Sequence, residues 1–321
     1  MAVSVIIATR NRATLLDECL THLARQQFAA GDEVIVVDNG SSDRTASVLA
    51  AHESRYPVPL RALQEPTPGK SHALACALAV ATGDVLAFTD DDVNVDALWI
   101  TSIKAAMTND AVALVGGPVA PRWERPAPSW LRLGASGYGR LAAPLALVDY
   151  GPDPVPLGSR TALGANLAVR RNVIARVGGF ARHLGKRHGT LLSGEDHDLC
   201  QRVQAAGLLA IYWPEARVEH WVPAARLRIR YFLAWFFWSG ITHAKLERAV
   251  LPRASRSLGG VPLYLVKRFV RGIIGALGAI ARLRMHAAVD RASDAAFAAG
   301  YAAAQWRLVA IEQPRRVAHP V

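Results

Sequence analysis

The stretch Val85-Leu86-Ala87-Phe88-Thr89-Asp90-Asp91-Asp92 sets an apolar run directly before three consecutive aspartates. The run is typical of a buried strand, which would leave the aspartates in the turn that follows it. Three like charges held this close repel one another, so at neutral pH they need water or a bound cation around them. Taken alone, the stretch fits a solvated acidic turn before a helix near Asp96 as well as it fits a metal site.

The first 116 residues alternate short apolar runs with helical patterns. Strands are predicted at residues 3–8, 34–37, 60–63, 85–89 and 112–115, and residues 70–82 form an alanine-rich helical pattern. Strands that are continuously apolar and separated by helices are typical of a parallel sheet covered by helices on both faces. The sequence therefore predicts an α/β fold with a Rossmann-like, mostly parallel central sheet flanked by helices.

Polar clusters follow three of these predicted strands where each strand ends. They are Thr9 to Arg12, Asp38 to Asp43, and Asp90 to Asp92. Ligands of such sheets bind outside the carboxyl ends of the strands, so we expect one cleft to collect all three clusters. The first strand is not followed by G-x-G-x-x-G, and Pro68-Gly69-Lys70-Ser71 lacks the earlier glycine of a P-loop. Neither a dinucleotide fingerprint nor a P-loop is therefore expected.

The chain becomes irregular after residue 116 and then regular again. From Gly117 to Gly158 it is rich in Pro, Gly, Trp and Arg, which predicts long loops that cover the cleft and carry specificity. Residues 172–177 and 194–207 predict helices, and residues 208–213 and 217–220 predict strands. The second helix opens with Glu195-Asp196-His197-Asp198, whose acidic residues would also suit a helix N-terminus with no further role.

Five short blocks of the sequence match one known family in the same order. They are Val3 to Arg12, Val34 to Asp43, Gly83 to Asp92, Gly164 to Arg171 and Gly194 to Leu199. Each block is weak alone, but together they resemble the family 2 nucleotide-sugar glycosyltransferases, which have the GT-A fold. The resemblance covers about residues 1–223. It implies a catalytic domain with a nucleotide-sugar half at 1–116 and an acceptor half at 117–223.

On the donor side, the resemblance implies roles for four residues. Thr9, Arg12 and Asp38 would lie around the nucleotide base and ribose, and Asp90 would face the ribose. Many relatives carry an arginine within the helix predicted at 70–82, whereas this chain does not. That departure puts an arginine contact to the pyrophosphate in doubt, and Lys70 at the start of the helix is the candidate to supply the positive charge instead.

The resemblance also implies a divalent cation that bridges the two phosphates. Asp92 would hold the cation, with Asp91 as a further candidate, and His220 corresponds to a histidine that completes the metal site in some relatives. A lone histidine is also often a hydrogen-bonded structural group, so both readings of His220 stay open. An aspartate-held Mn²⁺ or Mg²⁺ would neutralise the leaving diphosphate, and carboxylate with imidazole favours Mn²⁺ slightly.

On the acceptor side, Asp196 would be the general base, and Asn166 and Glu195 would line the acceptor. The acceptor hydroxyl is a poor nucleophile and needs a carboxylate within about 3 Å to take its proton. In the family, a base on the face opposite the leaving group gives inversion at the anomeric carbon. His197 and Asp198 are expected to support the helix or its surroundings, and Trp123 and Trp130 either hold their loop or stack on a sugar.

The last third of the chain is strongly basic. Residues 224–321 carry a net charge of +12, whereas residues 1–223 carry −1. Arg226, Arg228 and Arg230 precede an aromatic segment with Phe232, Trp235, Phe236 and Trp238, and residues 261–284 repeat the combination. Basic amphipathic helices of this kind lie in membrane interfaces, although a helical cap on the catalytic domain would look similar. We expect peripheral contact with an anionic membrane and no nucleic-acid partner.

Other general features bound the setting. The three cysteines are odd in number and unclustered, Met1 runs straight into a strand pattern, and no apolar stretch reaches the ~20 residues of a membrane span. These features favour a cytoplasmic protein, peripheral at the inner face of a membrane.

The sequence thus predicts a metal-dependent, inverting glycosyltransferase. Its donor would be a nucleotide sugar, UDP-linked by expectation, and its acceptor a hydroxyl on a glycan, a polysaccharide or a lipid-linked molecule. Two alternatives remain: a nucleotidyltransferase that makes a nucleotide sugar, and a non-catalytic membrane-associated scaffold built on a degenerate transferase domain. The intact Asp90 to Asp92 and Glu195-Asp196 argue against the scaffold.

Overall fold

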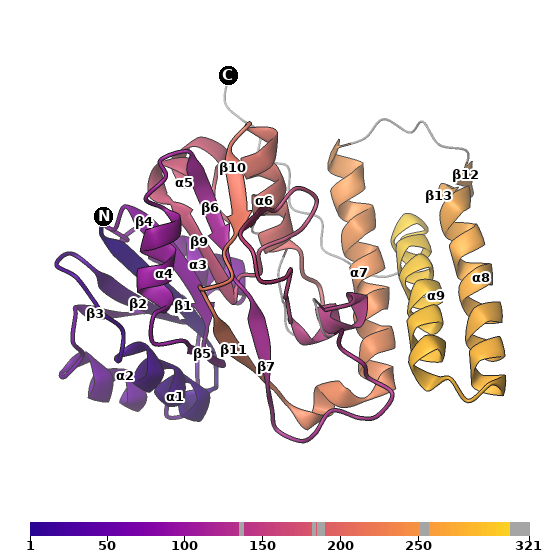
Figure 1. Ribbon diagram of the computed structural model, residues 1–321, viewed down its shortest axis with the longest axis horizontal. Helices are drawn as coiled ribbons and strands as arrows, with labels where there is room; N and C mark the ends of the chain where they lie inside the picture. The colour runs from indigo at the N-terminus through magenta and orange to yellow at the C-terminus, as the bar shows by residue number, and fades with distance from the viewer. Residues whose placement is uncertain (135–137, 182–183, 185–189, 251–256, 309–321) are drawn as a thin grey trace. The chain divides into compact units, whose positions relative to one another are not determined.

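The computed structural model describes residues 1–134, 138–181, 184, 190–250 and 257–308. Two compact units are visible in Figure 1. The first comprises Met1–Phe180 and Gly194–Arg228, and the second takes in the described parts of Ala181–Ser193 and Ile229–Val321. The short segment Ala181–Ser193 therefore belongs with the C-terminal helices, although it lies between parts of the first unit in the sequence.

A large sheet forms the centre of the first unit (Figure 1). In chain order its strands are β1 (Val3–Thr9), β2 (Glu33–Asp38), β3 (Leu60–Gln64), β4 (Val85–Asp90), β6 (Val112–Gly116), β8 (Val155–Pro156), β9 (Asn166–Arg170) and β10 (Leu209–Tyr212). Their spatial order is β3-β2-β1-β4-β9-β6-β10-β8. Strand β9 is antiparallel to β4 and β6, and β8 is antiparallel to β10, whereas the other pairs are parallel. The predicted α/β fold with a mostly parallel, helix-flanked sheet is confirmed.

Helices and a second, smaller sheet complete this unit. The helices are α1 (Ala13–Leu23), α2 (Thr45–Glu53), α3 (Lys70–Leu78), α4 (Trp99–Ala106), α5 (Arg171–Val177) and α6 (Glu195–Ala205), with 3-10 turns η1 (Arg140–Leu145) and η2 (Ala224–Leu227). The smaller sheet has the order β5-β11-β7, from β5 (Val93–Val95), β11 (Val218–Val222) and β7 (Val119–Trp123). It matters for the site because β5 begins immediately after the three aspartates.

Two sequence predictions need correction here. The stretch 117–158 is not loop throughout, because β7 pairs in parallel with β11 and η1 forms a turn further on. Strand β7 escaped prediction because it is a partly exposed edge strand that contains Pro121, and an edge strand tolerates the missing N–H of proline. Residues 135–137 of that stretch lie outside the described residues. The helix predicted at 70–82 ends earlier, at Leu78.

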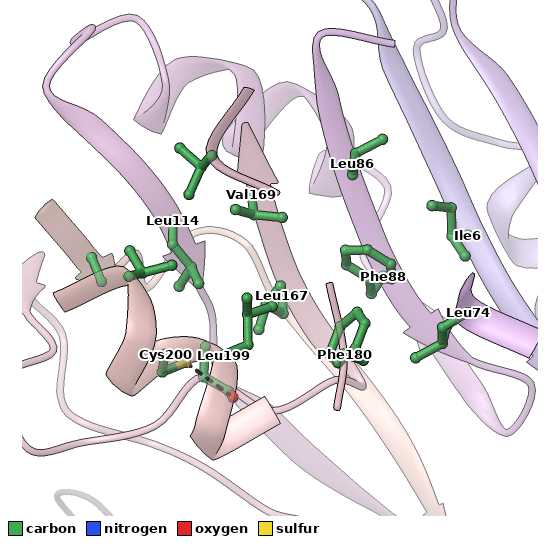
Figure 2. Close-up of a cluster of buried hydrophobic side chains, with 14 of the residues drawn as sticks. Ile6, Leu74, Leu86, Phe88, Leu114, Leu167, Val169, Phe180, Leu199 and Cys200 are labelled. Atoms are coloured by element: carbon green, nitrogen blue, oxygen red, sulfur yellow. Dashed lines mark hydrogen bonds between the residues drawn. The ribbon is translucent and has the colours of Figure 1, made fainter. Parts of the chain in front are cut away.

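The core of the first unit lies between the large sheet and its helices. Figure 2 shows side chains from β4 and β9 meeting those of α3 and α6. The rings of Phe88 and Phe180 meet edge to face, with centroids 4.9 Å apart, which is a favourable geometry for an aromatic pair. Leu167 and Leu199 are fully buried beside them. This packing fixes the strand ends and the start of α6 that carry the predicted site residues.

In its described residues, the second unit is built from three long helices and a short hairpin. They are α7 (Ile229–Val250), α8 (Leu263–Ala281) and α9 (Met285–Gln305), with β12 (Ser257–Leu258) paired to β13 (Val261–Pro262). Helix α9 packs against both α7 and α8, and Ile241, Leu265 and Tyr301 lie in the shared core. Among the described residues, none of the helices combines the length and the apolarity that crossing a membrane requires.

The aromatic side chains of α7 are less exposed than the sequence led us to expect. Phe232 and Phe236 are buried, whereas Trp235 and Trp238 are half-buried. Phe232 and Phe236 recur four residues apart with Gly240, which places all three on one inward face of the helix. The interpretation of this segment as a row of membrane-boundary aromatics is therefore wrong for two of its four members. Residues 251–256 and 309–321 of the basic tail lie outside the described residues.

Candidate active site

The three aspartates lie at the carboxyl end of β4, next to the end of β1. Strand register pairs Ala8 with Asp90 and Thr9 with Asp38 of β2, so the clusters that follow β1, β2 and β4 meet at one edge of the sheet. This is the edge at which parallel α/β sheets bind ligands. Asp38 is buried there and accepts a hydrogen bond from the Ser41 backbone N–H at 2.9 Å, which shapes the turn after β2.

Asp91 is buried between a hydroxyl and a guanidinium. The Thr9 hydroxyl donates to Asp91 Oδ2 at 2.8 Å, and Arg12 Nη1 donates to Asp91 Oδ1 at 2.8 Å. Burial raises the pKa of Asp91 to about 6, even though the charge of Arg12 pulls in the opposite direction. Arg12 itself is held as a cation, because attraction to Asp91 and Asp92 outweighs its partial burial and raises its pKa. Thr9 thus bonds to Asp91, and Arg12 bonds to both Asp91 and Asp92.

Asp92 sits between Arg12 and His220. Arg12 Nη1 donates to Asp92 Oδ2 at 2.6 Å, and the Asp92 Oδ1 atom lies 3.5 Å from His220 Nε2. The smaller sheet creates this proximity, because His220 pairs with Val93 across β11 and β5 and the Trp221 N–H donates to the Asp92 carbonyl at 2.9 Å. Burial favours the neutral form of Asp92, but attraction to His220 and Arg12 outweighs it and lowers the pKa of Asp92. The carboxylate is therefore charged.

The Asp92 and His220 pair has the donor chemistry for a divalent cation. Within the described part of the chain, Asp92 Oδ1 is a buried oxygen without a hydrogen-bond partner, although it faces an imidazole nitrogen. The same residues contain no group of three or more His, Cys, Asp or Glu side chains placed to hold a metal. Cations that bridge phosphates often take only one or two carboxylates from the protein and the rest of their ligands from phosphate and water. Two protein donors fit a site of that kind.

Lys70 joins the aspartates to the start of α6. Its Nζ donates to Asp90 Oδ1, and attraction to Asp90, Glu195 and Asp196 outweighs burial and raises the pKa of Lys70. Gly164 lies near both Lys70 and Asp196: a Cβ at this position would be 3.6 Å from Lys70 Nζ and 4.0 Å from Asp196 Oδ2. One ammonium group is therefore close to carboxylates from β4 and from α6.

Asp196 lies in the first turn of α6 with both oxygens engaged by backbone groups. The Gly164 N–H donates to Asp196 Oδ2 at 3.0 Å and the His197 N–H donates to Oδ1 at 2.9 Å. These bonds fix the direction of the carboxylate while leaving lone pairs for a further donor. Glu195 beside it is buried. The structure thus brings Asp196 and Lys70 near Asp90 at the carboxyl end of β4.

Asn166 behaves differently from the expectation of an acceptor-side contact. It is buried, its Oδ1 accepts from the Trp99 indole N–H at 2.8 Å, and its amide nitrogen donates to the carbonyls of Pro118 and Ala216 at 2.9 and 2.7 Å. All of these partners are structural. Asn166 therefore ties β9 to two neighbouring loops, and its side chain does not line open space.

His197 and Asp198 were expected to support α6 or its surroundings, and both make contacts of that kind. His197 Nδ1 lies 2.6 Å from the Thr161 hydroxyl, and Arg202 donates to Asp198 at 2.9 Å one turn along α6. Asn39 was not singled out by sequence reasoning, yet it shapes the approach to Lys70. Its Oδ1 accepts from the N–H of Gly69, a residue whose φ of +134° strongly favours glycine. The sequence feature that could have revealed this arrangement is Gly69, which comes immediately before α3.

Arg226 is another residue near the site that sequence reasoning did not select. Its Nη1 lies 3.5 Å from His220 Nε2, the same atom that faces Asp92, and its charge also helps to lower the pKa of Asp92. The sequence assigned Arg226 to the basic tail, yet it belongs to the first unit.

A family model for glycosyl transferase family 2 matches residues 4–154. The succinoglycan biosynthesis protein ExoM of Rhizobium meliloti is 30% identical over 221 residues, covering 66% of this chain and 64% of that protein. The glucosyl-dolichyl phosphate glucuronosyltransferase of Haloferax volcanii is 27% identical over 267 residues, covering 79% and 80%. The pre-mycofactocin glycosyltransferase of Mycobacterium tuberculosis is 32% identical, and the match spans 42% of its length. The chain thus spans between about two fifths and four fifths of these relatives.

Solved structures share the fold at low sequence identity. The mannosyltransferase PcManGT from Pyrobaculum calidifontis, in complex with GDP-Man and Mn²⁺, superposes with a TM-score of 0.63 at 20% identity over 95% of this chain and 87% of that one. GalNAc-T7 with UDP, GalNAc and Mn²⁺ gives a TM-score of 0.55 at 14% identity, covering 78% and 52%. At these identities the likeness concerns the fold.

Proposed function

Because the chain belongs to glycosyl transferase family 2, we propose that it is an inverting glycosyltransferase that moves a sugar from a nucleotide-sugar donor to a hydroxyl acceptor. One observation carries the proposal: Lys70, bonded to Asp90 at the end of β4, lies close to Asp196 at the start of α6. A cation beside a strand-end carboxylate suits a diphosphate. A fixed carboxylate near it suits a proton acceptor for the attacking hydroxyl.

The donor would bind over the ends of β1, β2 and β4. Asp38 and Thr9 are proposed to lie around the base and ribose, with Asp90 facing the ribose hydroxyls. Lys70 would then share its charge between Asp90 and the diphosphate, in place of the arginine that many relatives have. Arg12 supports the same region by neutralising Asp91 and Asp92 and so limiting the repulsion that an incoming diphosphate meets.

We propose that Asp92 and His220 would hold a divalent cation, with Asp91 adjoining. The buried Asp92 Oδ1 and the facing imidazole support this assignment, and two structural neighbours contain Mn²⁺ with a nucleotide or nucleotide sugar. Bound there, Mn²⁺ or Mg²⁺ would act as a Lewis acid that stabilises the charge growing on the leaving diphosphate. Arg226, next to His220, would add to the positive charge.

Asp196 is proposed as the general base. Its two backbone hydrogen bonds hold the carboxylate in place, so that it can accept the proton of the acceptor hydroxyl as the new glycosidic bond forms. Attack opposite the leaving group would invert the anomeric configuration. Glu195 is proposed on the acceptor side, whereas the buried hydrogen bonds of Asn166 favour a supporting role for that residue.

We also propose a UDP-linked donor and an acceptor that is a glycan or a lipid-linked hydroxyl, with peripheral contact to an anionic membrane. The basic C-terminal third supports the membrane contact. The names of two relatives, a succinoglycan biosynthesis protein and a glucosyl-dolichyl phosphate glucuronosyltransferase, fit acceptors of these classes.

The proposed function is tested by comparing Asp196→Asn with Asp198→Asn. Both replacements are isosteric and lie in the first turn of α6, but Asp198 pairs with Arg202 and has no proposed catalytic role. We expect Asp196→Asn to lower turnover of a Mn²⁺-bound UDP-sugar by at least ~100-fold with little change in nucleotide affinity, and Asp198→Asn to retain most activity. Turnover is followed as UDP release. GDP-sugars are assayed in parallel to test which nucleotide base the donor carries.

Two results would contradict the proposal. Full turnover by Asp196→Asn would remove its role as base. Release of pyrophosphate from a nucleoside triphosphate and a sugar phosphate, with no release of nucleoside diphosphate from any nucleotide sugar, would indicate a nucleotidyltransferase.

A further inference from the structure

Helix α8 has one face covered by the protein and one face exposed. Leu265, Gly272 and Ala276 are buried on the side where α9 packs, and Gly272 lets the two helices approach closely. A Cβ on Gly272 would come within 2.8 Å of the Arg291 carbonyl oxygen. Helix α8 is thus fixed to its unit through small residues, and its opposite side is available for another contact.

The opposite side is a continuous apolar stripe. Val270, Ile274 and Leu277 lie on it with exposed fractions of 49%, 66% and 63%, and their spacing of four and three residues keeps them in line. Exposed apolar side chains that flank this line are Phe269, Ile273 and Ile280. Single exposed apolar residues are normal on a protein surface, whereas six on one helix side form a patch that calls for a partner. We name these six residues the α8 apolar face.

Positive charge surrounds the α8 apolar face. Lys267 and Arg271 are exposed on the same helix, and Arg282 and Arg284 are exposed just beyond its end. Residues 261–289 contain no aspartate or glutamate. The fifth basic residue of this stretch, Arg268, is already paired with Asp294 of α9 at 2.8 Å and stacks over the Phe297 ring. The remaining four cations flank an apolar surface with no acidic residue in the same stretch.

We propose that the α8 apolar face docks onto an anionic lipid surface, with the helix lying in the plane of the membrane interface. An apolar stripe bordered by Lys and Arg is the pattern of interfacial helices, whose apolar side enters the bilayer by about 5–10 Å while the cations meet lipid headgroups. A second copy of this chain is a poorer occupant, because pairing two such faces would bring their Lys and Arg together. Anionic headgroups instead neutralise these charges.

This inference concerns a surface outside the proposed transfer site and separates two segments that look alike in sequence. The aromatic residues of α7 and the stripe of α8 both follow basic residues. Phe232 and Phe236 of α7 are buried, whereas the α8 apolar face is exposed. Membrane contact is therefore assigned to α8, and it would hold the second unit at a bilayer where a lipid-linked acceptor is found.

The test is flotation of the full chain with vesicles of phosphatidylcholine, with and without phosphatidylglycerol, at low salt. Leu277→Glu places a charge in the α8 apolar face. Leu98→Glu makes the same change at a leucine of the first unit that is 51% exposed. We expect binding to the phosphatidylglycerol vesicles, weakened at least ~tenfold by Leu277→Glu and unchanged by Leu98→Glu. A Lys267→Gln, Arg271→Gln variant should lose its preference for anionic lipid.

The inference would be overturned if the full chain fails to float with the anionic vesicles, or if both glutamate variants bind equally. It would also be overturned if Leu277→Glu converts a dimer into a monomer in gel filtration while vesicle binding is absent, because the face would then be a self-association surface. Each variant is also checked for Mn²⁺-dependent UDP binding without vesicles. Because flotation needs no nucleotide, its failure leaves the proposed sugar transfer unaffected.

Discussion

Asp92 has different surroundings at its two carboxylate oxygens. Oδ2 accepts a hydrogen bond from Arg12, and Oδ1 faces His220 at 3.5 Å. Replacement by asparagine would preserve the Arg12 contact through the amide oxygen and turn an NH₂ group, which has no lone pair to offer a metal, toward His220. The substitution therefore keeps a hydrogen-bond acceptor for Arg12 and removes the proposed metal ligand together with its negative charge.

We predict that Asp92→Asn weakens Mn²⁺-dependent binding of UDP by at least ~tenfold and leaves metal-independent binding nearly unchanged, because a proposed metal ligand is lost. Isothermal titration calorimetry with and without Mn²⁺ measures both quantities. Asp84→Asn is the matched control, since Asp84 lies just before β4, at the opposite end from Asp92, and accepts the Ala2 N–H at 2.9 Å. An equal loss with and without Mn²⁺ would assign Asp92 to the nucleotide or the fold instead.

At this scale the sequence identifies residues better than it identifies their contacts. The Asp90–Asp92 cluster could be predicted because an apolar strand points directly to it. The bridging of Asp91 and Asp92 by Arg12 could not, because it depends on how the chain bends after β1, where Asn11 has a positive φ of 52°. Asn166 shows the limit in the other direction. Its block matches the family, yet only the folded chain reveals that its amide group makes three hydrogen bonds within the protein.

At the scale of elements, the strands that run parallel in the large sheet were predictable, including β3 at its edge, whereas β7 and the antiparallel direction of β9 were not. Strands β1, β2 and β4 are apolar on both faces because helices cover both sides, and that pattern is local. The apolar residues of β9 also indicate regular secondary structure, but the antiparallel direction of this strand depends on its pairing with β4 and β6, which are far away in the sequence. Strand β7 exists through its pairing with β11, and a partly exposed strand with a proline has little local signature.

The packing of α7 on α9 depends on glycine, which gives an element-scale prediction. A Cβ on Gly300 would lie 1.8 Å from the Phe237 carbonyl oxygen, so Gly300→Ala must push the two helices apart. We predict a loss of ~1–3 kcal/mol in the free energy of unfolding of the second unit, as for other overpacked cores. Urea denaturation followed by tryptophan fluorescence measures it, since Trp235 and Trp238 lie on α7.

Gly278→Ala is the control for this prediction. Gly278 is also a helix-interior glycine, but the nearest atom to its added Cβ is Arg282 Nη1 at 3.5 Å, an ordinary contact. Alanine should stabilise α8 there by up to ~1 kcal/mol through helix propensity. Opposite signs for the two substitutions would support close helix contact at Gly300, and a neutral Gly300→Ala would argue against it.

At the scale of the whole molecule, charge and proposed function divide between the two units. The residues proposed for donor and metal binding all lie in the first unit. They are Thr9, Arg12, Asp38, Lys70, Asp90, Asp91, Asp92 and His220. The four exposed basic residues around the α8 apolar face, Lys267, Arg271, Arg282 and Arg284, lie in the second unit. A boundary near residue 223 was predicted because the family resemblance ends there and the basic tail begins, but nothing in the sequence indicated that Ala181–Ser193 joins the second unit. Leu192, buried in the core of that unit, explains the assignment.

This division predicts that residues 1–228 bind UDP with Mn²⁺ about as tightly as the full chain but fail to float with phosphatidylglycerol vesicles. Because removing the helices leaves Leu192 without its packing partners, Leu192 is replaced by serine in both proteins so that the comparison stays matched. Circular dichroism establishes that the fragment is folded, and calorimetry and flotation then give the two readouts. A folded fragment whose UDP affinity falls more than ~tenfold would mean that the second unit takes part in donor binding, and a fragment that floats would move the lipid-binding surface away from α8.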